Sequence, residues 1–182
     1  MMLQPRPLVT PATCSRGMRP LAAAALCVLA GALAACTDPA AAEENRPQTS
    51  LPRGEIQLAG RSFSVQIAHT EASRRKGLMF TNALAENDGM VFCFPQPIML
   101  NFYMRNVPIA LDIAYIRSDG SGGWIVDSIH TMAARDERLY PSANACLFAL
   151  EVRAGTFAAL GVRPGTPVQI GQPILDAQRK AE

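Results

Sequence analysis

Alternation of apolar and polar residues constrains the fold of this chain more than any other feature of its sequence. In the segment 55–68, apolar side chains occupy every second position on both sides of an Ala59-Gly60 interruption. A period of two is typical of a strand that buries one face. The segment is therefore predicted to be a β-hairpin, and strand-like segments recur as far as residue 170.

The other strand-like segments are rich in β-branched and aromatic residues and are separated by Pro, Gly, Asn and Asp. The run at 90–94 is apolar throughout, as in a strand buried on both faces, and Pro95 and Pro97 are expected to end it. The polar segment 130–144 is expected to be irregular. The remaining predicted strands lie at 102–105, 111–116, 124–129, 146–152 and 168–170.

Two short helices are predicted between these strands. One spans 71–76, with Thr70 as its N-cap and Gly77 behind it, and the other spans 156–160, with Thr156 as its N-cap. About seven or eight short strands with frequent turns predict a mainly β domain. We expect a compact β-barrel or a jelly-roll-like sandwich with two short helices.

The first 35 residues have the layout of an export signal. Arg16 and Arg19 precede an apolar run at 21–35, which is the order of charged and apolar regions in a secretory signal peptide. The run is shorter than the roughly 20 residues of a transmembrane helix. Because Met18 begins a more compact signal than Met1 does, translation is expected to start at Met18.

The apolar run ends in small residues directly before Cys36. This order resembles the lipobox of bacterial lipoproteins, in which the cysteine is acylated and becomes the first residue of the mature chain. The alternatives are an uncleaved apolar anchor and an ordinary secretory cleavage site. A lipidated Cys36 predicts a protein anchored on the periplasmic side of the cell envelope, at the outer membrane in preference to the inner one.

These features divide the chain into four segments. Residues 1–35 are the predicted signal peptide, 36–53 a lipidated tether without periodic pattern, 54–171 the β-domain, and 172–182 a C-terminal tail. The whole chain has a formal net charge of +2, and three of its basic residues precede Cys36. The mature chain is therefore nearly neutral, which argues against nucleic acid as a partner.

Several blocks of sequence occur in an order that resembles the domain of unknown function 192 family. They are RKGLMF at 75–80, GMVFCF at 89–94, FYMRN at 102–106, PIALD at 108–112, LEVRAG at 150–155 and GVRPG at 161–165. The resemblance spans essentially the whole predicted domain, and Tyr103 stands where the family usually has Trp. It implies a small β-rich protein, often secreted, and it implies no activity.

Arg105, Asn106 and Asp112 are the candidate ligand-binding residues. Pro108 bends the chain between them, so that strands on either side of the bend would bring Arg105 and Asp112 to one end of the domain. A guanidinium and an amide suit recognition of a carboxylate, a phosphate or sugar hydroxyls. In the alternative, Arg105 pairs with Asp112 and the Asp112 carboxylate accepts backbone N–H groups, which is an architectural role.

Asp112 and Glu151 form an alternative pair of catalytic residues. Two carboxylic acids can act as general acid and base, as in glycoside hydrolysis, so the alternative function is a small periplasmic hydrolase. The sequence holds no nucleophile elbow, zinc-protease, phosphate-loop or dinucleotide motif. We therefore expect no catalytic residue, no cofactor and no metal site, and a protein that binds a small ligand or an envelope protein.

Cys93 and Cys146 remain in the mature chain once the signal peptide is removed and Cys36 is acylated. In an oxidising compartment they could form a disulfide between two strands. The resemblance favours pairing, because the family more often has aliphatic residues at both positions. The alternative is two separate buried thiols that pack as small apolar side chains.

Overall fold

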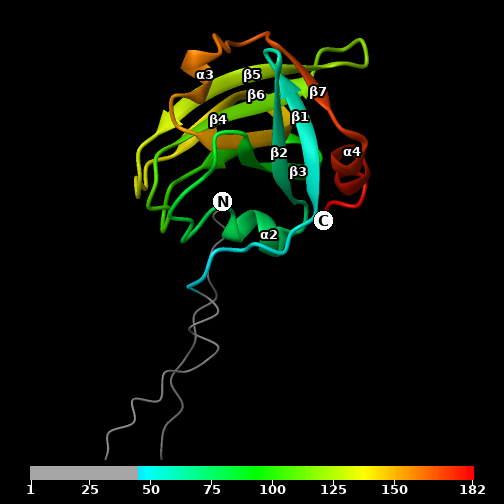
Figure 1. Cartoon of the computed structure of the whole chain (residues 1–182). Helices are drawn as coiled ribbons and strands as arrows, with labels where there is room; N and C mark the ends of the chain where they lie inside the picture. The colour runs from blue at the N-terminus through cyan, green and yellow to red at the C-terminus, as the bar shows by residue number, and fades with distance from the viewer. Residues whose placement is uncertain (1–44) are drawn as a thin grey trace, which may run out of the picture.

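The computed structural model of the protein describes residues 45–182 (Figure 1). The predicted signal peptide, Cys36 and the first part of the predicted tether lie outside these residues. The described part contains seven strands and three short helices, which confirms the predicted mainly β class. The strands are β1 (Arg53–Leu58), β2 (Arg61–Ala68), β3 (Asp88–Phe102), β4 (Leu111–Ser118), β5 (Trp124–Met132), β6 (Tyr140–Arg153) and β7 (Pro167–Ile170), and the helices are α2 (Glu71–Lys76), α3 (Thr156–Ala159) and α4 (Gln172–Gln178).

The seven strands form one sheet whose order closes on itself, β1-β2-β3-β6-β4-β5-β7. β7 closes the ring because it pairs with both β5 and β1. Neighbouring strands are antiparallel apart from β2 and β3, which are parallel and are connected through α2. Figure 1 shows β1 and β2 side by side, with α4 next to β1 and α2 below the strands.

The predicted hairpin at 55–68 is confirmed as the pair β1–β2, and the predicted strands at 111–116 and 124–129 lie in β4 and β5, which pair as a second hairpin. Ala59 and Gly60 form the two-residue turn of the first hairpin and have φ values of 50° and 77°. A two-residue turn with both central residues at positive φ follows the right-handed twist of the strands that it joins. The predicted strand at 168–170 is β7, which completes the ring.

Two apolar clusters lie on opposite faces of the central strands. One takes residues from all seven strands and is called the ring core; the other takes residues from β2 to β6 and from adjoining loops and is called the outer core. Along β3, Met90 and Phe92 belong to the outer core, whereas Val91 and Cys93 belong to the ring core. This alternation confirms that the 90–94 strand is buried on both faces.

β3 continues through Pro95 and Pro97, so the prediction that these prolines end the strand is wrong. The register of β3 against β6 jumps between Cys93 and Ile98, and residues 95–97 within this jump are exposed. Proline lacks an N–H donor, and a bulge is one of the few places in a strand where that donor is not needed. The irregular register therefore lets one 15-residue strand pass both prolines.

The expectation that 130–144 is irregular is wrong at both ends of that segment. β5 continues to Met132, and β6 begins at Tyr140. Tyr140 and Ser142 are buried while Pro141 between them is exposed, so the segment keeps the alternation of a strand although its sequence is polar. Residues 133–139 alone form a loop.

The first predicted helix is confirmed with its caps. In α2, the Thr70 side chain accepts a hydrogen bond from the Ser73 N–H at 3.2 Å, and Ser73 Oγ accepts one from the Thr70 N–H at 3.0 Å. Gly77 follows the helix with a φ of 50°. In α3 the N-cap is Gly155, and no side chain caps the helix from that position, so the assignment of Thr156 as the cap is wrong by one residue.

Both ends of the described range pack on the domain. The Gln48 side-chain amide donates to the carbonyl groups of Ser73 and Gly77 at 2.9 Å each, so the last part of the predicted tether closes the end of α2. The predicted tail forms α4, and Ile174 of this helix is fully buried in the ring core. No helix within residues 45–182 has the length and apolar character needed to cross a membrane.

Candidate functional site

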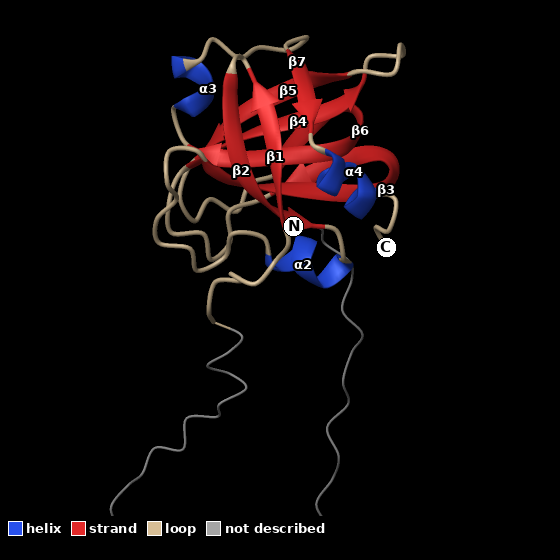
Figure 2. Cartoon of the chain, turned by 45° about the vertical axis from the view of Figure 1, so that its right-hand side comes forward, coloured by secondary structure: helices blue, strands red, loops and turns tan. Residues whose placement is uncertain are grey.

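Three loops of the domain are held together near α2: 77–87, 103–110 and 133–139 (Figure 2). Backbone hydrogen bonds join them. The Phe80 N–H donates to the Asn106 carbonyl at 2.7 Å, and the Arg135 N–H donates to the Val107 carbonyl at 2.9 Å. The loop that carries the predicted residues Arg105 and Asn106 therefore lies between the other two.

A pocket of about 340 Å³ opens where these loops meet. We call it the polar pocket. Its side chains combine one guanidinium, three amides, one aromatic ring and two prolines. The lining residues are Asn45, Pro47, Phe80, Asn82, Asn106, Pro108 and Arg135.

The backbone of the polar pocket is strained. Four described residues other than glycine have positive φ, and three of them line this pocket: Phe80 at 62°, Asn106 at 59° and Arg135 at 58°. A left-handed conformation costs on the order of 1 kcal/mol for a residue with a Cβ atom, and such residues are concentrated at binding sites and active sites. The loops are thus held in a shape that local preference alone does not favour.

Arg105, the predicted ligand-binding guanidinium, does not line the polar pocket, whereas Arg135, which the sequence analysis did not single out, does. Arg105 forms an ion pair with Glu137 at 2.9 Å, and its guanidinium lies 5.2 Å from the centre of the Tyr103 ring. The hydrogen bond to Glu137 raises the pKa of Arg105. The exposed side chain of Arg135, by contrast, forms no hydrogen bond or ion pair with any other residue of the described range. Arg135 is therefore the guanidinium that the polar pocket offers to a ligand.

Asp112 has a structural role and does not line the polar pocket. Its side chain is buried and accepts hydrogen bonds from Thr131 Oγ1 at 2.7 Å and from the Phe157 N–H at 2.9 Å. The second bond satisfies a backbone donor in the first turn of α3, which has no cap of its own. Of the three predicted ligand-binding residues, the structure brings only Asn106 into the polar pocket.

Glu151 lies in the middle of β6 and is 4% exposed. Its neighbours Leu150 and Val152 belong to the ring core, so by alternation Glu151 points to the opposite face, toward the outer core. Burial raises the pKa of Glu151 to about 7. A raised carboxyl pKa in an apolar surrounding is typical of functional acids.

Asp112 and Glu151 do not face one another. In the pairing of β4 with β6, Asp112 lies opposite Val152 and Glu151 lies opposite Ile113. Directly paired residues share a face, and adjacent residues of a strand do not. The two carboxylates therefore point to opposite faces of the sheet, and this geometry gives the hydrolase alternative no support.

The disulfide between Cys93 and Cys146 is not formed, and the alternative of two separate thiols is correct for the structure. Both cysteines are free and buried. Cys93 packs in the ring core and Cys146 in the outer core, although their strands are neighbours. Burial raises the pKa of each thiol to about 12, as expected of inert apolar packing.

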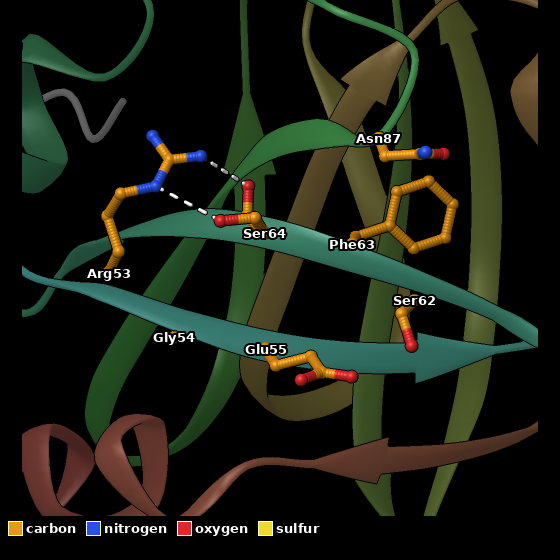
Figure 3. Close-up of a pocket in the computed structure, with 7 residues that line it drawn as sticks. All are labelled: Arg53, Gly54, Glu55, Ser62, Phe63, Ser64 and Asn87. Atoms are coloured by element: carbon orange, nitrogen blue, oxygen red, sulfur yellow. Dashed lines mark hydrogen bonds between the residues drawn. The ribbon is translucent and has the colours of Figure 1, made fainter.

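A wider hollow of about 440 Å³ lies over the β1–β2 hairpin (Figure 3). Its charged groups already have partners. Arg53 donates to the Ser64 hydroxyl and carbonyl and pairs with Asp88 at 2.7 Å, and hydrogen bonds from Ser62 and Gln57 lower the pKa of Glu55. Because binding there would compete with these contacts, the hollow is a weaker candidate than the polar pocket.

Metal-ligating side chains do not gather in the described part of the chain. Between residues 45 and 182, no group of three or more His, Cys, Asp and Glu side chains is arranged to hold a metal ion. His130 Nε2 donates a hydrogen bond to the Pro141 carbonyl at 2.8 Å, which is a structural contact between β5 and β6.

Sequence reasoning missed Phe80, Asn82 and Arg135. Arg135 stands in a polar stretch without a recognisable motif, and no residue type signals that Phe80 adopts a left-handed conformation. The only available signal was the concentration of charged residues at 135–138 between two strand-like segments.

Comparison with known proteins places the domain in a family. A family model described as DUF192, "Uncharacterized ACR", matches residues 54–170. A search of curated proteins gives no match.

Two solved structures resemble the domain. One is a protein from Sinorhizobium meliloti 1021 whose suggested role is transcription regulation; it is 29% identical, with a TM-score of 0.61, and the match covers 68% of this chain and 97% of that one. The other is a protein of unknown function from Novosphingobium aromaticivorans DSM 12444; it is 33% identical, with a TM-score of 0.63, and the match covers 68% of this chain and 89% of that one. The chain described here belongs to the DUF192 family.

Proposed function

We propose that this protein is a lipid-anchored envelope protein whose β-domain binds a small ligand through the polar pocket, without catalysis. The ligand class is a compound that presents an oxyanion, either a carboxylate or a phosphate. The closed order of strands supports a compact barrel over a two-sheet jelly roll as the scaffold. The loops at its rim supply the binding groups.

One observation carries the proposal: the unpartnered guanidinium of Arg135 lies with the amides of Asn82 and Asn106 around a pocket of about 340 Å³. A guanidinium can donate two parallel hydrogen bonds to a carboxylate or phosphate, and amides can complete the shell. The positive φ values of Asn106 and Arg135 support the same reading, because strained loops persist where their shape serves a function.

The envelope location rests on the sequence before the domain. Cys36 follows an apolar run of the length and position of a signal peptide, and acylation of this cysteine would anchor the mature chain to a membrane from the periplasmic side. We keep the outer membrane as the proposed site of the anchor.

Binding can be tested with protein purified from its own membranes and examined by native mass spectrometry. We expect the acyl mass on Cys36 and a co-purified anionic molecule. Substitution Arg135→Ala should remove that molecule, because a lost charge-assisted pair lowers affinity by about tenfold or more. Arg105→Ala is the matched control, since Arg105 is exposed and paired with Glu137 outside the pocket.

The substitution Asn106→Gly tests the contribution of the Asn106 side chain to ligand binding without straining the fold. Glycine adopts the left-handed conformation of Asn106 without strain, so the variant should fold with nearly unchanged stability while ligand retention falls. If Arg135→Ala and Asn106→Gly both retain the molecule, the polar pocket is not the binding site. If the purified protein retains residues 1–35 and Cys36 has a free thiol, the proposal that the protein is lipid-anchored is wrong.

A further inference from the structure

A second, narrow pocket is lined in part by two of the loops that form the polar pocket, 77–87 and 103–110. Its floor includes the Glu151 side chain, and its walls are mostly apolar and aromatic. We call it the Glu151 pocket. It is lined by Arg74, Lys76, Gly77, Leu78, Phe92, Phe102, Tyr103, Val107 and Glu151.

The carboxyl group of Glu151 lacks a partner within the part of the chain that the structure describes. No side chain or backbone group of residues 45–182 donates a hydrogen bond to it or forms an ion pair with it. The residue is 4% exposed, and it lines the pocket. A buried carboxyl in this position strongly favours a donor or a cation that enters from outside.

The two cationic residues at the rim do not provide that partner. Arg74 donates to the carbonyls of His69 and Cys93, and its guanidinium lies 5.2 Å from the centre of the Phe94 ring. The Lys76 ammonium lies 5.1 Å from the centre of the Phe80 ring. Both charges are thus engaged with other groups. Tyr115 of β4 interacts electrostatically with Glu151, but its hydroxyl donates a hydrogen bond to the Tyr140 carbonyl.

The size of the pocket limits what can enter. Its accessible volume is about 10 Å³, which is room for one group the size of a water molecule. A primary ammonium has this size, whereas a quaternary ammonium and a planar guanidinium are larger. A metal ion is a poor fit as well, because a single carboxylate among apolar side chains does not supply the several oxygen ligands that hard cations take.

We propose that the Glu151 pocket binds a primary ammonium group at the end of an unbranched chain, with Glu151 as the counter-ion and the rings of Phe102 and Tyr103 beside the charge. The buried carboxylate supplies charge and a hydrogen-bond acceptor, and aromatic rings attract a desolvated cation. The source of the ammonium is either a lysine side chain or the α-amino group of a glycine. This site is separate from the oxyanion site and does not depend on it.

Ammonium binding at this site is coupled to a proton. Burial raises the pKa of Glu151 to about 7, so below that pH the carboxyl must release its proton before it can act as a counter-ion. Affinity for an ammonium is therefore expected to fall by about tenfold for each pH unit below 7. A neutral alcohol of the same length would show no such dependence.

The test uses the full chain and n-butylammonium chloride as the probe, with 1-butanol and tetramethylammonium as comparison compounds. Binding is followed by calorimetry at pH 8.0 and pH 5.5. We expect n-butylammonium alone to bind, with an affinity at least tenfold lower at pH 5.5, and we expect Glu151→Gln to lose binding. Glu137→Gln is the matched control, since Glu137 is exposed and lies outside the pocket.

If Glu151→Gln does not fold, the proposal can still be tested by a measurement on the unsubstituted protein. The ¹³C signal of the Glu151 carboxyl is titrated with and without n-butylammonium, and the ammonium should lower its pKa by one unit or more. N-acetyl-lysine methylamide and glycinamide then distinguish a lysine side chain from an α-amino group. Equal response to 1-butanol, an unchanged Glu151 pKa or undiminished binding in the folded Glu151→Gln variant would each overturn the proposal.

Discussion

Glu151 makes the outer core sensitive to pH because its carboxyl lies between apolar strands. In the neutral form it packs with the outer core, and in the charged form it lacks the water that stabilises a carboxylate. Its pKa is therefore raised from 4.5 to about 7. A raised carboxyl pKa means that folding is favoured while the group is neutral.

The first prediction concerns the pH dependence of stability. Neutral Glu151 contributes to the stability of the folded state. This contribution is fully present below pH 4.5, the pKa of Glu151 in the unfolded chain, and is lost as the pH rises through about 7, its pKa in the folded state. In Glu151→Gln this loss disappears, so the free energy of unfolding should fall less between pH 5 and pH 8, by on the order of 1 to 3 kcal/mol. Urea unfolding at the two pH values measures the difference.

Glu137→Gln serves as the control, because Glu137 is exposed and its pKa is lowered by the hydrogen bond from Arg105. A Glu151→Gln variant with the same pH slope as the unsubstituted protein would show that Glu151 is ionised in the folded state without penalty.

Residue type in the sequence predicted only part of the polar pocket. Asn106 could be selected because an amide next to a proline bend is suited to a loop, and it does line the polar pocket. The choice between Arg105 and Arg135 could not be made, because it depends on which guanidinium meets a carboxylate across the loops. The burial of Glu151 was likewise hidden until the strand register was known.

Asp127 joins the elements β5 and β6 through a set of hydrogen bonds. Its carboxylate accepts from the Asn144 side chain at 2.7 Å, the Ala143 N–H at 2.9 Å, Ser128 Oγ at 3.0 Å and the Asn144 N–H at 3.1 Å. It also pairs with Arg117 at 3.2 Å. These contacts hold the part of β6 that lies within the register shift opposite Met99 and Asn101 of β3.

The second prediction is that Asp127→Asn destabilises the domain by about 1 to 3 kcal/mol at pH 7, because backbone donors of β6 lose a charged acceptor. Burial alone would raise the pKa of Asp127, but the hydrogen bonds from Asn144, Ser128 and Ala143 outweigh it, and the pKa is lowered. The stabilisation is therefore present above pH 3.8 and is lost as the pH falls through the lowered pKa.

Thermal unfolding at pH 7 and pH 3 measures this effect. The difference in unfolding temperature between Asp127→Asn and the unsubstituted protein should be smaller at pH 3 than at pH 7, because the Asp127 carboxyl becomes protonated as the pH falls. Asp176→Asn is the control, since Asp176 lies exposed on α4 and contacts only residues of its own helix. If the difference in unfolding temperature is the same at both pH values, the loss of stability in Asp127→Asn comes from altered packing and not from the lost charge.

Elements defined by local chemistry were predictable from the sequence, and elements defined by pairing were not. The β1–β2 turn and the caps of α2 depend on neighbouring residues, so Gly60 and Thr70 identify them. The length of β3 depends on how its bulge lies against β6, and Pro95 gives no sign of that. The start of β6 at Tyr140 depends in the same way on its partner strand.

On the scale of the whole molecule, α4 belongs to the folded unit although it lies beyond the residues that match the family. Figure 2 shows α4 beside β1. The Gly171 N–H donates to the Glu55 carbonyl at 2.9 Å, and the Gln178 side chain donates to the Phe94 carbonyl at 3.1 Å. Gly54 leaves the room that Ile174 fills, because a Cβ atom at Gly54 would lie 2.6 Å from Ile174 Cγ1.

The third prediction is that Ile174→Ala lowers the free energy of unfolding by about 2 to 4 kcal/mol, since a fully buried side chain leaves a cavity in the ring core. Urea unfolding measures the loss. Gln172→Ala on the exposed side of the same helix should change stability by less than about 0.5 kcal/mol. Equal effects of the two substitutions would show that α4 is not part of the cooperative unit.

The global arrangement was only partly accessible from sequence. Alternation predicted a mainly β domain, and the apolar run at 90–94 predicted burial on two faces. The parallel pairing of β2 with β3, and the separation of Cys93 from Cys146 on opposite faces, depend on strand order and register across the sheet. Local patterns carry little information on either.

The closure of the ring by β7 has a consequence for how the protein is made. β1 is synthesised early, yet one of its edges obtains its partner only when residues 168–170 emerge from the ribosome. Until then the nascent chain presents an unpaired strand edge, and such edges recruit other chains. Rapid completion of translation, or a chaperone that covers the β1 edge, would therefore limit aggregation of the nascent domain.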